Sequence, residues 1–251
     1  MANYSFDFLG KTILITGASS GIGKQICIEC AQAGANVILM GRDHERLTQT
    51  LNLMPGNGHI MIAGDNRDEN FIEETCKRLP QLDGFIYSAG LIKLIPLKFL
   101  NSTNIDEMLS VNLRAPILFV ALLFKLKKFN PYASIVLLSS ITGSVIGYIA
   151  NSTYGASKGG LQAFCKSAAL ELAKNNVRIN CVAPGMVESE GAEKIGQQVS
   201  NENIELDKKN YPLKRYGLTS EIAASCLFLL SDGSKWTTGT TVVIDGGFTA
   251  Q

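Results

Sequence analysis

The chain has 251 residues, of which 46% are hydrophobic and 24 are glycine, and this suits one large α/β domain or two small ones. Lysine and arginine total 23 against 22 aspartates and glutamates. This nearly neutral net charge does not indicate binding to nucleic acid or to an anionic membrane. The N-terminal residues lack the basic and apolar regions of a signal peptide, and the six cysteines are scattered, so we expect free thiols in the reducing cytoplasm.

Short apolar runs alternate with helical stretches nearly to the end of the chain. Continuous apolar strands separated by helices indicate a parallel sheet covered on both faces. We therefore predict one domain over residues 1–251, an α/β fold with a doubly wound, Rossmann-type sheet of about seven strands. In such a sheet, the ligand crevice lies beyond the carboxyl ends of the strands. The predicted strands are 12–16, 36–40, 58–63, 83–89, 134–140, 177–183 and 240–245.

Three segments need separate interpretation. The most apolar run, residues 115–124, is too short to span a bilayer and predicts a buried helix. CIEC at 27–30 matches Cys-x-x-Cys but lies within a predicted helix, so we favour packing over redox or metal chemistry and expect no metal site. The polar segment 187–210 leaves the carboxyl end of a strand, and we interpret it as a lid over the crevice rather than a solvated insertion.

A glycine-rich turn, TGASSGIG at 16–23, follows the first predicted strand and opens the first predicted helix. Glycines permit a sharp turn and close backbone approach, while a helix N-terminus directs free N–H groups at a pyrophosphate. This context favours a nucleotide-binding turn over glycines that merely end a strand. The residues assigned to cofactor binding here are Gly17, Ser19, Ser20, Gly21, Ile22 and Gly23.

The second predicted strand ends beside the expected position of the adenosine ribose. A count of about twenty residues from the turn falls on Asp43, which would suggest NAD(H). The strand ends at Met40, however, so Gly41 takes the place of such an acid and Arg42 follows it. A guanidinium can bind a 2′-phosphate through two hydrogen bonds, and Asp43 suits the N-cap of the next helix. We therefore predict NADP(H) rather than NAD(H).

Two residues after the third predicted strand complete the adenosine end. Asp65 in GDNRD is a candidate acceptor for the adenine amino group, with Asn66 beside it. A local turn or cap is an almost equally good interpretation of Asp65.

YGASK at 154–158 spaces a tyrosine four residues before a lysine. On a helix this spacing places Tyr154 and Lys158 on one face, with Cβ atoms about 5–6 Å apart. The pair is either part of an ordinary helix start or a phenol placed beside a cation so that it can give and take a proton.

Six segments occur in the order typical of short-chain dehydrogenases/reductases of the roughly 250-residue class, and the chain resembles that family over essentially its whole length. They are TGASSGIG (16–23), YSAG (87–90), SVNL (110–113), LLSSITG (137–143), YGASK (154–158) and VAPGMVES (182–189). The ending at 221–248 is also similar to that family's C-terminus. 3-Oxoacyl-acyl-carrier-protein reductases, and reductases of sugars and small ketones, are among the relatives that it resembles.

The resemblance implies that Tyr154 is the general acid/base, with Lys158 and the oxidised nicotinamide lowering its pKa from about 10. It implies that Ser140 hydrogen-bonds the substrate oxygen, while strand alternation points Ser139 away. It also implies that Asn112 anchors a water of the proton relay. The alternative for Asn112 is a purely structural role, in which its amide lies inside a helix and forms hydrogen bonds with the local backbone.

The resemblance further implies cofactor contacts after two more strands. These contacts come from Ser88, Ala89, Gly90, Pro184, Gly185, Val187 and Ser189, together with Tyr154 and Lys158. The family usually carries Asn-Asn where this chain has Tyr87 and Ser88, so we expect a modest change in cofactor geometry.

The leading hypothesis is an NADP(H)-dependent oxidoreductase that transfers hydride between nicotinamide and a carbonyl or secondary alcohol. Its substrate would be a small molecule or an acyl-carrier-linked carbonyl compound, with no nucleic acid or membrane as partner. The resemblance implies a homotetramer, or a dimer, that pairs the helices near 102–126 and 152–174. The alternatives are a catalytically inactive nucleotide-binding regulatory protein and a sugar-nucleotide-modifying relative.

Overall fold

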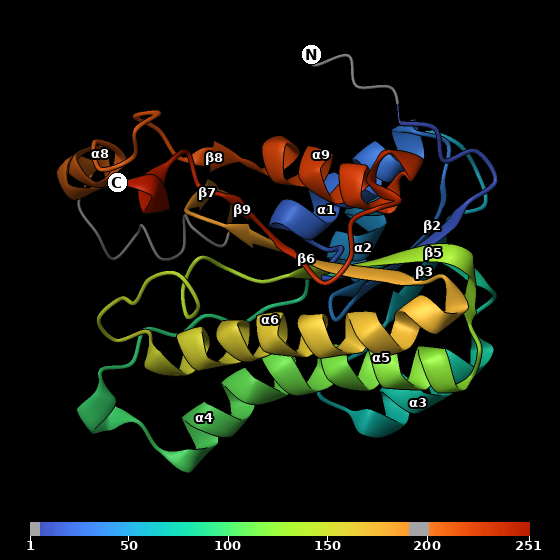
Figure 1. The fold of residues 1–251 in the computed structure, drawn as a ribbon, viewed down its shortest axis with the longest axis horizontal. Coiled ribbons are helices and arrows are strands. Elements are labelled where there is room, and N and C mark those ends of the chain that lie inside the picture. Colours follow the sequence, from blue (N-terminus) through green and yellow to red (C-terminus); the bar gives the residue numbers. More distant parts are fainter. Residues whose placement is uncertain (1–5, 191–200) are drawn as a thin grey trace.

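The computed structural model describes residues 6–190 and 201–251, and its centre is one parallel sheet (Figure 1). Seven strands follow in the order β3-β2-β1-β4-β5-β6-β9. Each predicted strand corresponds to one of them, so the doubly wound fold is confirmed. The strands are β1 (Thr12–Thr16), β2 (Asn36–Gly41), β3 (Ile60–Ala63), β4 (Leu82–Tyr87), β5 (Phe129–Leu138), β6 (Arg178–Pro184) and β9 (Thr241–Ile244).

Helices cover both faces of the sheet, as the alternation of strands and helices predicts (Figure 1). One face carries α1 (Gly21–Gln32), α2 (His44–Leu51) and α9 (Thr219–Leu230). The other face carries α3 (Glu69–Arg78), α4 (Ser102–Leu109), α5 (Ala115–Lys125) and α6 (Ser152–Leu172). Short helical turns lie at Leu97–Phe99, Ala173–Asn175, Asp232–Ser234 and Phe248–Ala250.

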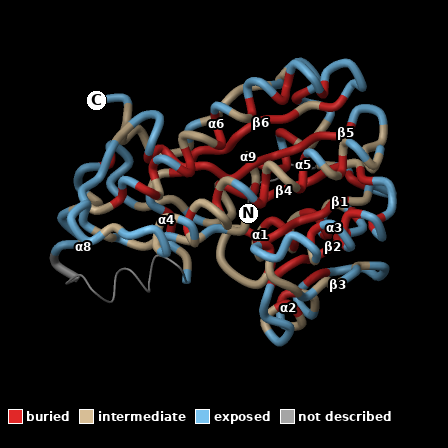
Figure 2. Tube along the Cα trace, turned by 90° about the horizontal axis from the view of Figure 1, so that it is seen from below, coloured by how far each residue is buried: buried red, intermediate tan, exposed pale blue. Residues whose placement is uncertain are grey.

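The buried residues form two apolar clusters, one on each face, and Figure 2 shows burial concentrated along the central strands. Tyr87, which stands where the family usually has asparagine, is fully buried in one of these clusters. Its ring centroid lies 6.1 Å from that of Phe119 and 6.4 Å from that of Phe85. Its hydroxyl donates to the Val111 carbonyl at 2.7 Å, so the ring packs under α5 while its polar atom has a partner.

β4 and β5 each end two residues earlier than predicted. β4 ends at Tyr87, since the N–H groups of Ser88 and Ala89 approach Thr16 Oγ1 at 3.2 and 3.3 Å. β5 ends at Leu138 rather than at residue 140, although the Ser139 N–H still donates to the Val182 carbonyl of β6 at 2.8 Å.

The apolar run at 115–124 belongs to a helical stretch that also includes α4. α4, a π-turn at Ser110–Arg114 and α5 join into one stretch, Ser102–Lys125, whose best window has a mean hydropathy of 1.6. By length and composition alone this stretch could cross a membrane. It lies against the sheet, however, where Phe119 and Leu123 are buried, and core helices of this kind meet the same criterion.

Segment 187–210 contains β7 (Val187–Glu188) and α8 (Asn201–Lys208), and its residues 191–200 lie outside the described residues. β7 pairs in parallel with β8 (Gly217–Leu218), which anchors the start of the segment. The lid interpretation stays a prediction. Cys27 and Cys30 are free and buried in α1, as the packing interpretation of CIEC predicts.

Candidate active site

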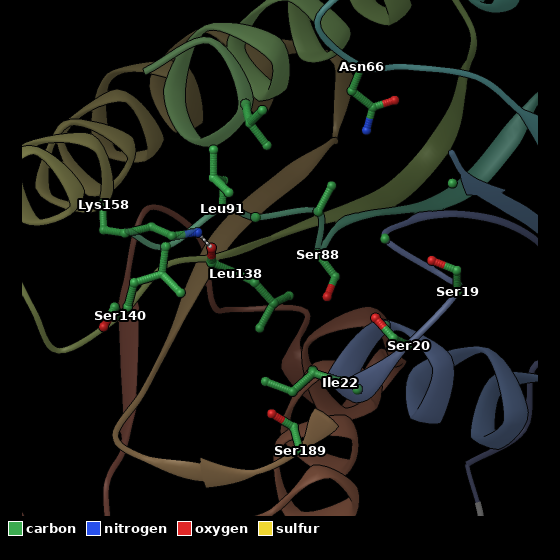
Figure 3. Close-up of a pocket in the computed structure, with 18 of the residues that line it drawn as sticks. Ser19, Ser20, Ile22, Asn66, Ser88, Leu91, Leu138, Ser140, Lys158 and Ser189 are labelled. Carbon is green, nitrogen blue, oxygen red and sulfur yellow. Dashed lines mark hydrogen bonds between the residues drawn. The ribbon is translucent and has the colours of Figure 1, made fainter. Parts of the chain in front are cut away.

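A cavity of about 400 Å³ opens beyond the carboxyl ends of the parallel strands. It is lined by the segments that follow β1, β2, β3, β4, β5 and β6. Figure 3 shows Lys158 and Ser140 at one end, Ser19, Ser20 and Asn66 at the other, and Ser88 and Ile22 between them. The crevice therefore lies where the fold predicts it.

Every predicted site residue except Asn112 lines this cavity. From the N-terminal half of the chain these are Gly17, Ser19, Ser20, Gly21, Ile22, Gly23, Arg42, Asp65, Asn66, Ser88, Ala89 and Gly90. From the C-terminal half they are Ser140, Tyr154, Lys158, Pro184, Gly185, Val187 and Ser189. The sequence interpretation missed several lining residues, among them Arg67, Leu91, Ile92, Glu107, Leu138 and Met186.

The glycine-rich turn between β1 and α1 requires glycine at two positions. Gly17 has φ +68°, and a Cβ atom there would lie 2.7 Å from the Ala89 nitrogen. A Cβ atom at Gly23 would lie 2.2 Å from the Gly17 carbonyl oxygen. The two glycines therefore let β1, the turn and the segment after β4 pack in direct contact.

The N-terminus of α1 suits a pyrophosphate. Asp43, Asp68 and Asn101 each accept backbone N–H bonds at the starts of α2, α3 and α4. Ser20 makes no such bond at the start of α1, and the first turn of α1 has no acidic residue. Because Ser20, Gly21 and Ile22 line the cavity, uncapped N–H groups and the positive end of the helix dipole lie at its wall.

Opposite charges are arranged around the adenosine end. Asp65 accepts bonds from Arg67 Nε at 2.9 Å and Nη2 at 2.6 Å, and these contacts hold the pKa of its carboxyl below the usual value. Arg67 Nη1 also lies 3.7 Å from a Glu107 oxygen, and Lys93 Nζ lies 2.5 Å from the other. The structure thus gives Asp65 the local turn contact, since its neighbour two residues later already occupies both carboxylate oxygens.

Arg42 differs from these cations. Within residues 6–190 and 201–251, no ion pair or hydrogen bond is found for its guanidinium, although its charge helps to lower the pKa of Asp65 and Glu107. Asn66 is buried and lines the same cavity, and its Oδ1 has no partner among the described residues. The adenosine end therefore holds one cation and one amide oxygen free to bind a ligand.

At the other end of the cavity, α6 is fastened to the end of β5. Lys158 Nζ donates to the Leu138 carbonyl at 2.7 Å, as the dashed line in Figure 3 shows. Ser139 Oγ donates to the Lys158 carbonyl at 3.0 Å and accepts from Gln162 Nε2 at 2.8 Å. Ser139 is thus bonded to α6 although it also lines the cavity, and its predicted orientation away from the site stays a prediction. Burial lowers the pKa of Lys158 to about 8.

Tyr154 and Ser140 face each other beside this lysine. Burial raises the pKa of Tyr154, and its hydrogen bond with Ser140 only partly offsets this. The prediction that Lys158 and the oxidised nicotinamide together lower this pKa stays a prediction. Lys158 Nζ lies 5.8 Å from the Tyr154 ring centroid and already donates to Leu138, so desolvation of the phenolate dominates.

Asn112 lies in the π-turn, where it is buried and binds the loop after β4. Its Oδ1 accepts from the Leu91 nitrogen at 2.8 Å, and its Nδ2 donates to the Leu91 carbonyl at 2.7 Å. Nδ2 also approaches Ser157 Oγ at 3.2 Å. These contacts are not local in sequence, and they make Asn112 a link between this loop and α6.

The cavity-lining residues that the sequence interpretation missed differ in whether a sequence pattern could have indicated them. Arg67 follows Asp65 by two residues, a spacing that is compatible with a local ion pair. Glu107 reaches the cavity from α4, and no local pattern marks it.

Comparisons with known proteins agree with this geometry. A family model described as Enoyl-(Acyl carrier protein) reductase matches residues 17–249. The chain is 31% identical over 242 residues to the 3-oxoacyl-acyl-carrier-protein reductase FabG of Rickettsia felis, covering 96% of this chain and 98% of that protein. It is 34% identical over 253 residues to L-xylulose reductase of Caenorhabditis elegans, covering 98% of each.

Among solved structures, a short-chain dehydrogenase/reductase of Brucella melitensis, described as a glucose/ribitol dehydrogenase, superposes with a TM-score of 0.90. That comparison covers 97% of this chain and 98% of the other at 28% identity. The protein belongs to the short-chain dehydrogenase/reductase family of oxidoreductases, which use nicotinamide cofactors.

The low pKa of Lys158 leads to a test of stability against pH. Because this pKa falls from 10.5 to about 8 on folding, the unfolded chain binds more protons between these values, and stability rises with pH there. Relative to Lys158→Met, the wild-type protein should gain about 3 kcal/mol of unfolding free energy across this window, at about 1.4 kcal/mol per pKa unit. Urea unfolding of both proteins at a series of pH values measures the difference, and parallel curves would contradict the assignment.

Proposed function

We propose that this protein is an NADP(H)-dependent carbonyl reductase or alcohol dehydrogenase with Tyr154 as its general acid/base. The observation that carries the proposal is that Ser140, Tyr154 and Lys158 meet at one end of the cavity whose other end holds the α1 N-terminus and Arg42. When bound, the nicotinamide supplies or accepts the hydride. The residues of the chain bind and orient the cofactor and the substrate, and they transfer the proton.

Each polar group at the catalytic end has a distinct role. Ser140 Oγ accepts from the Thr142 N–H at 3.1 Å, so its proton remains for donation to the substrate oxygen or to Tyr154. In the reductive direction, Tyr154 donates its phenolic proton to the developing alkoxide, and its raised pKa keeps that proton present at neutral pH. Lys158 uses one N–H on Leu138, and its other two donors are available for ribose hydroxyls.

Tyr154→Phe tests the chemical step. Removing a general acid should lower kcat by about 100-fold to 10,000-fold while the Kd for NADP(H) changes little. Tyr132→Phe, at an exposed tyrosine far from the cavity in sequence and fold, is the matched control and should keep wild-type turnover. Steady-state kinetics with a panel of ketones and aldehydes measures the effect. Near-wild-type turnover by Tyr154→Phe would refute the mechanism, and no turnover by wild type would favour the inactive nucleotide-binding alternative.

Arg42→Ala tests the cofactor preference. A charged hydrogen bond contributes about 1.5–3 kcal/mol, so the Kd for NADPH should rise by about 10-fold to 100-fold while that for NADH stays within twofold. Arg78→Ala, an exposed arginine 3.9 Å from Glu74, serves as the control. Fluorescence titration with each cofactor gives the constants. An equal loss for both cofactors, or a wild-type preference for NADH, would reverse the assignment.

We also propose a homotetramer, with a dimer as the alternative, built on the face of α4, α5 and α6. Only 39% of the most apolar window of Ser102–Lys125 is buried within one chain, and Leu170 on α6 is 76% exposed. An apolar surface of this kind favours association.

Light scattering after gel filtration should give four times the 27.1 kDa of one chain. Leu170→Glu places a charge on this face and should shift the mass downward, whereas Lys174→Glu is a control for added charge at the end of the helix. A mass of one chain for the wild-type protein at micromolar concentration would contradict the proposal.

A further inference from the structure

The catalytic end of the cavity has an apolar wall. Ile92, from the loop after β4, and Met186, from the segment after β6, line the cavity together with Ser140 and Tyr154. Each of these two apolar residues is 38% exposed, so part of each side chain is open to a ligand. Leu91 and Leu138 add further apolar surface at the same end (Figure 3).

Aromatic residues from distant parts of the chain pack next to Met186. Tyr211 Oη accepts from the Met186 N–H at 3.3 Å, and its ring centroid lies 4.8 Å from that of Phe248. Phe248 lies 6.4 Å from Tyr148, which belongs to the loop between Ser140 and Tyr154. The apolar wall is therefore defined as Ile92, Met186, Leu91 and Leu138, which line the cavity. Tyr211 is almost fully buried and contacts the backbone of Met186.

The loop after β4 also meets the loop before α6. The Ile95 N–H donates to the Ala150 carbonyl at 2.7 Å, which fixes residues 92–95 against residues 148–150. Tyr148 is 46% exposed and Ile149 almost fully exposed. The two loops therefore present apolar side chains near one another.

The charged side chains in these segments already have partners within the chain. Lys93 pairs with Glu107 at 2.5 Å, and Asp245 accepts from Thr249 at 2.7 Å. Asp207 accepts from the Tyr216 hydroxyl at 2.8 Å. None of these charges lines the cavity beside the apolar wall, except Glu107 at the adenosine end, in the part of the chain that the structure describes.

We propose that the substrate is an uncharged carbonyl compound whose substituents are apolar, and that they lie against the apolar wall while its oxygen meets Ser140 and Tyr154. This inference rests on the proposed function. Burying hydroxyl groups without partners is unfavourable, so a polyhydroxy ketone is disfavoured at this wall. A carboxylate or phosphate beside the carbonyl would also be disfavoured. Among the described residues, the cation that lines this end is Lys158, which already donates to Leu138 and whose other donors are assigned to the ribose hydroxyls.

The experiment compares carbonyl compounds of similar size at saturating NADPH. The probes are 4-phenylbutan-2-one, xylulose and a short 2-oxo acid, with the N-acetylcysteamine thioester of 3-oxooctanoic acid as a fourth. The phenyl ketone or the thioester should exceed xylulose and the oxo acid in kcat/KM by at least about 100-fold. A higher value for the phenyl ketone indicates a free ketone as the source of the apolar carbonyl group, and a higher value for the thioester indicates an acyl chain.

Ile92→Ser tests the wall directly. It should lower kcat/KM for the phenyl ketone by about 10-fold to 100-fold, mainly through KM, and change the value for acetone much less. Leu53→Ser, at an exposed leucine after α2, is the matched control for folding and solubility. Calorimetric binding of 4-phenylbutan-2-ol in the presence of NADP+ gives a second measure, with a weaker Kd and a smaller negative heat-capacity change for Ile92→Ser.

The outcomes separate the two proposals. A preference for xylulose or for the oxo acid, or an unchanged phenyl-ketone KM in Ile92→Ser, overturns the apolar substrate and leaves the oxidoreductase proposal standing. Absence of turnover with every carbonyl compound overturns the proposed function. In that case, tighter calorimetric binding of the phenyl alcohol than of a polyol would still support the apolar wall.

Discussion

The buried hydrogen bond from Lys158 to the Leu138 carbonyl is the contact on which the geometry of the site depends. It fastens α6 to the carboxyl end of β5, and the bonds of Ser139 and Gln162 repeat this connection at the next positions. With strand and helix held together, Ser140 and Tyr154 face each other without either being required to move. The connection has a cost, because burial of the ammonium lowers the Lys158 pKa to about 8.

At the adenosine end, most charged side chains form ion pairs with one another. Asp65, Arg67, Glu107 and Lys93 alternate in sign and neutralise one another. Arg42 has no such partner among the described residues, which makes it the cation that can respond to a ligand without first breaking an ion pair. This difference, rather than the number of basic residues, supports the proposed preference for a 2′-phosphate.

Much of the fold and most of the site could be predicted from local sequence. The strands follow from apolar runs, and parallel strands bring their carboxyl ends to one edge, so residues after β1, β4, β5 and β6 had to meet there. Contacts set by distant packing could not be predicted. Three examples depend on side-chain directions. They are the ion pair of Asp65 with Arg67, the hydrogen bonds from Asn112 to Leu91, and the ring contact of Tyr148 with Phe248. The raised pKa of Tyr154 likewise follows from burial, which the spacing of YGASK does not reveal.

The central claim is that the cavity holds a nicotinamide next to a carbonyl that Tyr154 protonates. The most direct measurement is isotope transfer: a ketone is reduced with NADPH carrying deuterium on both positions of nicotinamide C4, and the alcohol is examined by mass spectrometry. The account predicts one deuterium on the carbinol carbon of each product molecule, and none at that carbon in product formed with unlabelled NADPH in deuterated water, where solvent deuterium goes to the hydroxyl oxygen. Alcohol that carries solvent deuterium at that carbon, with none from the cofactor, would contradict it.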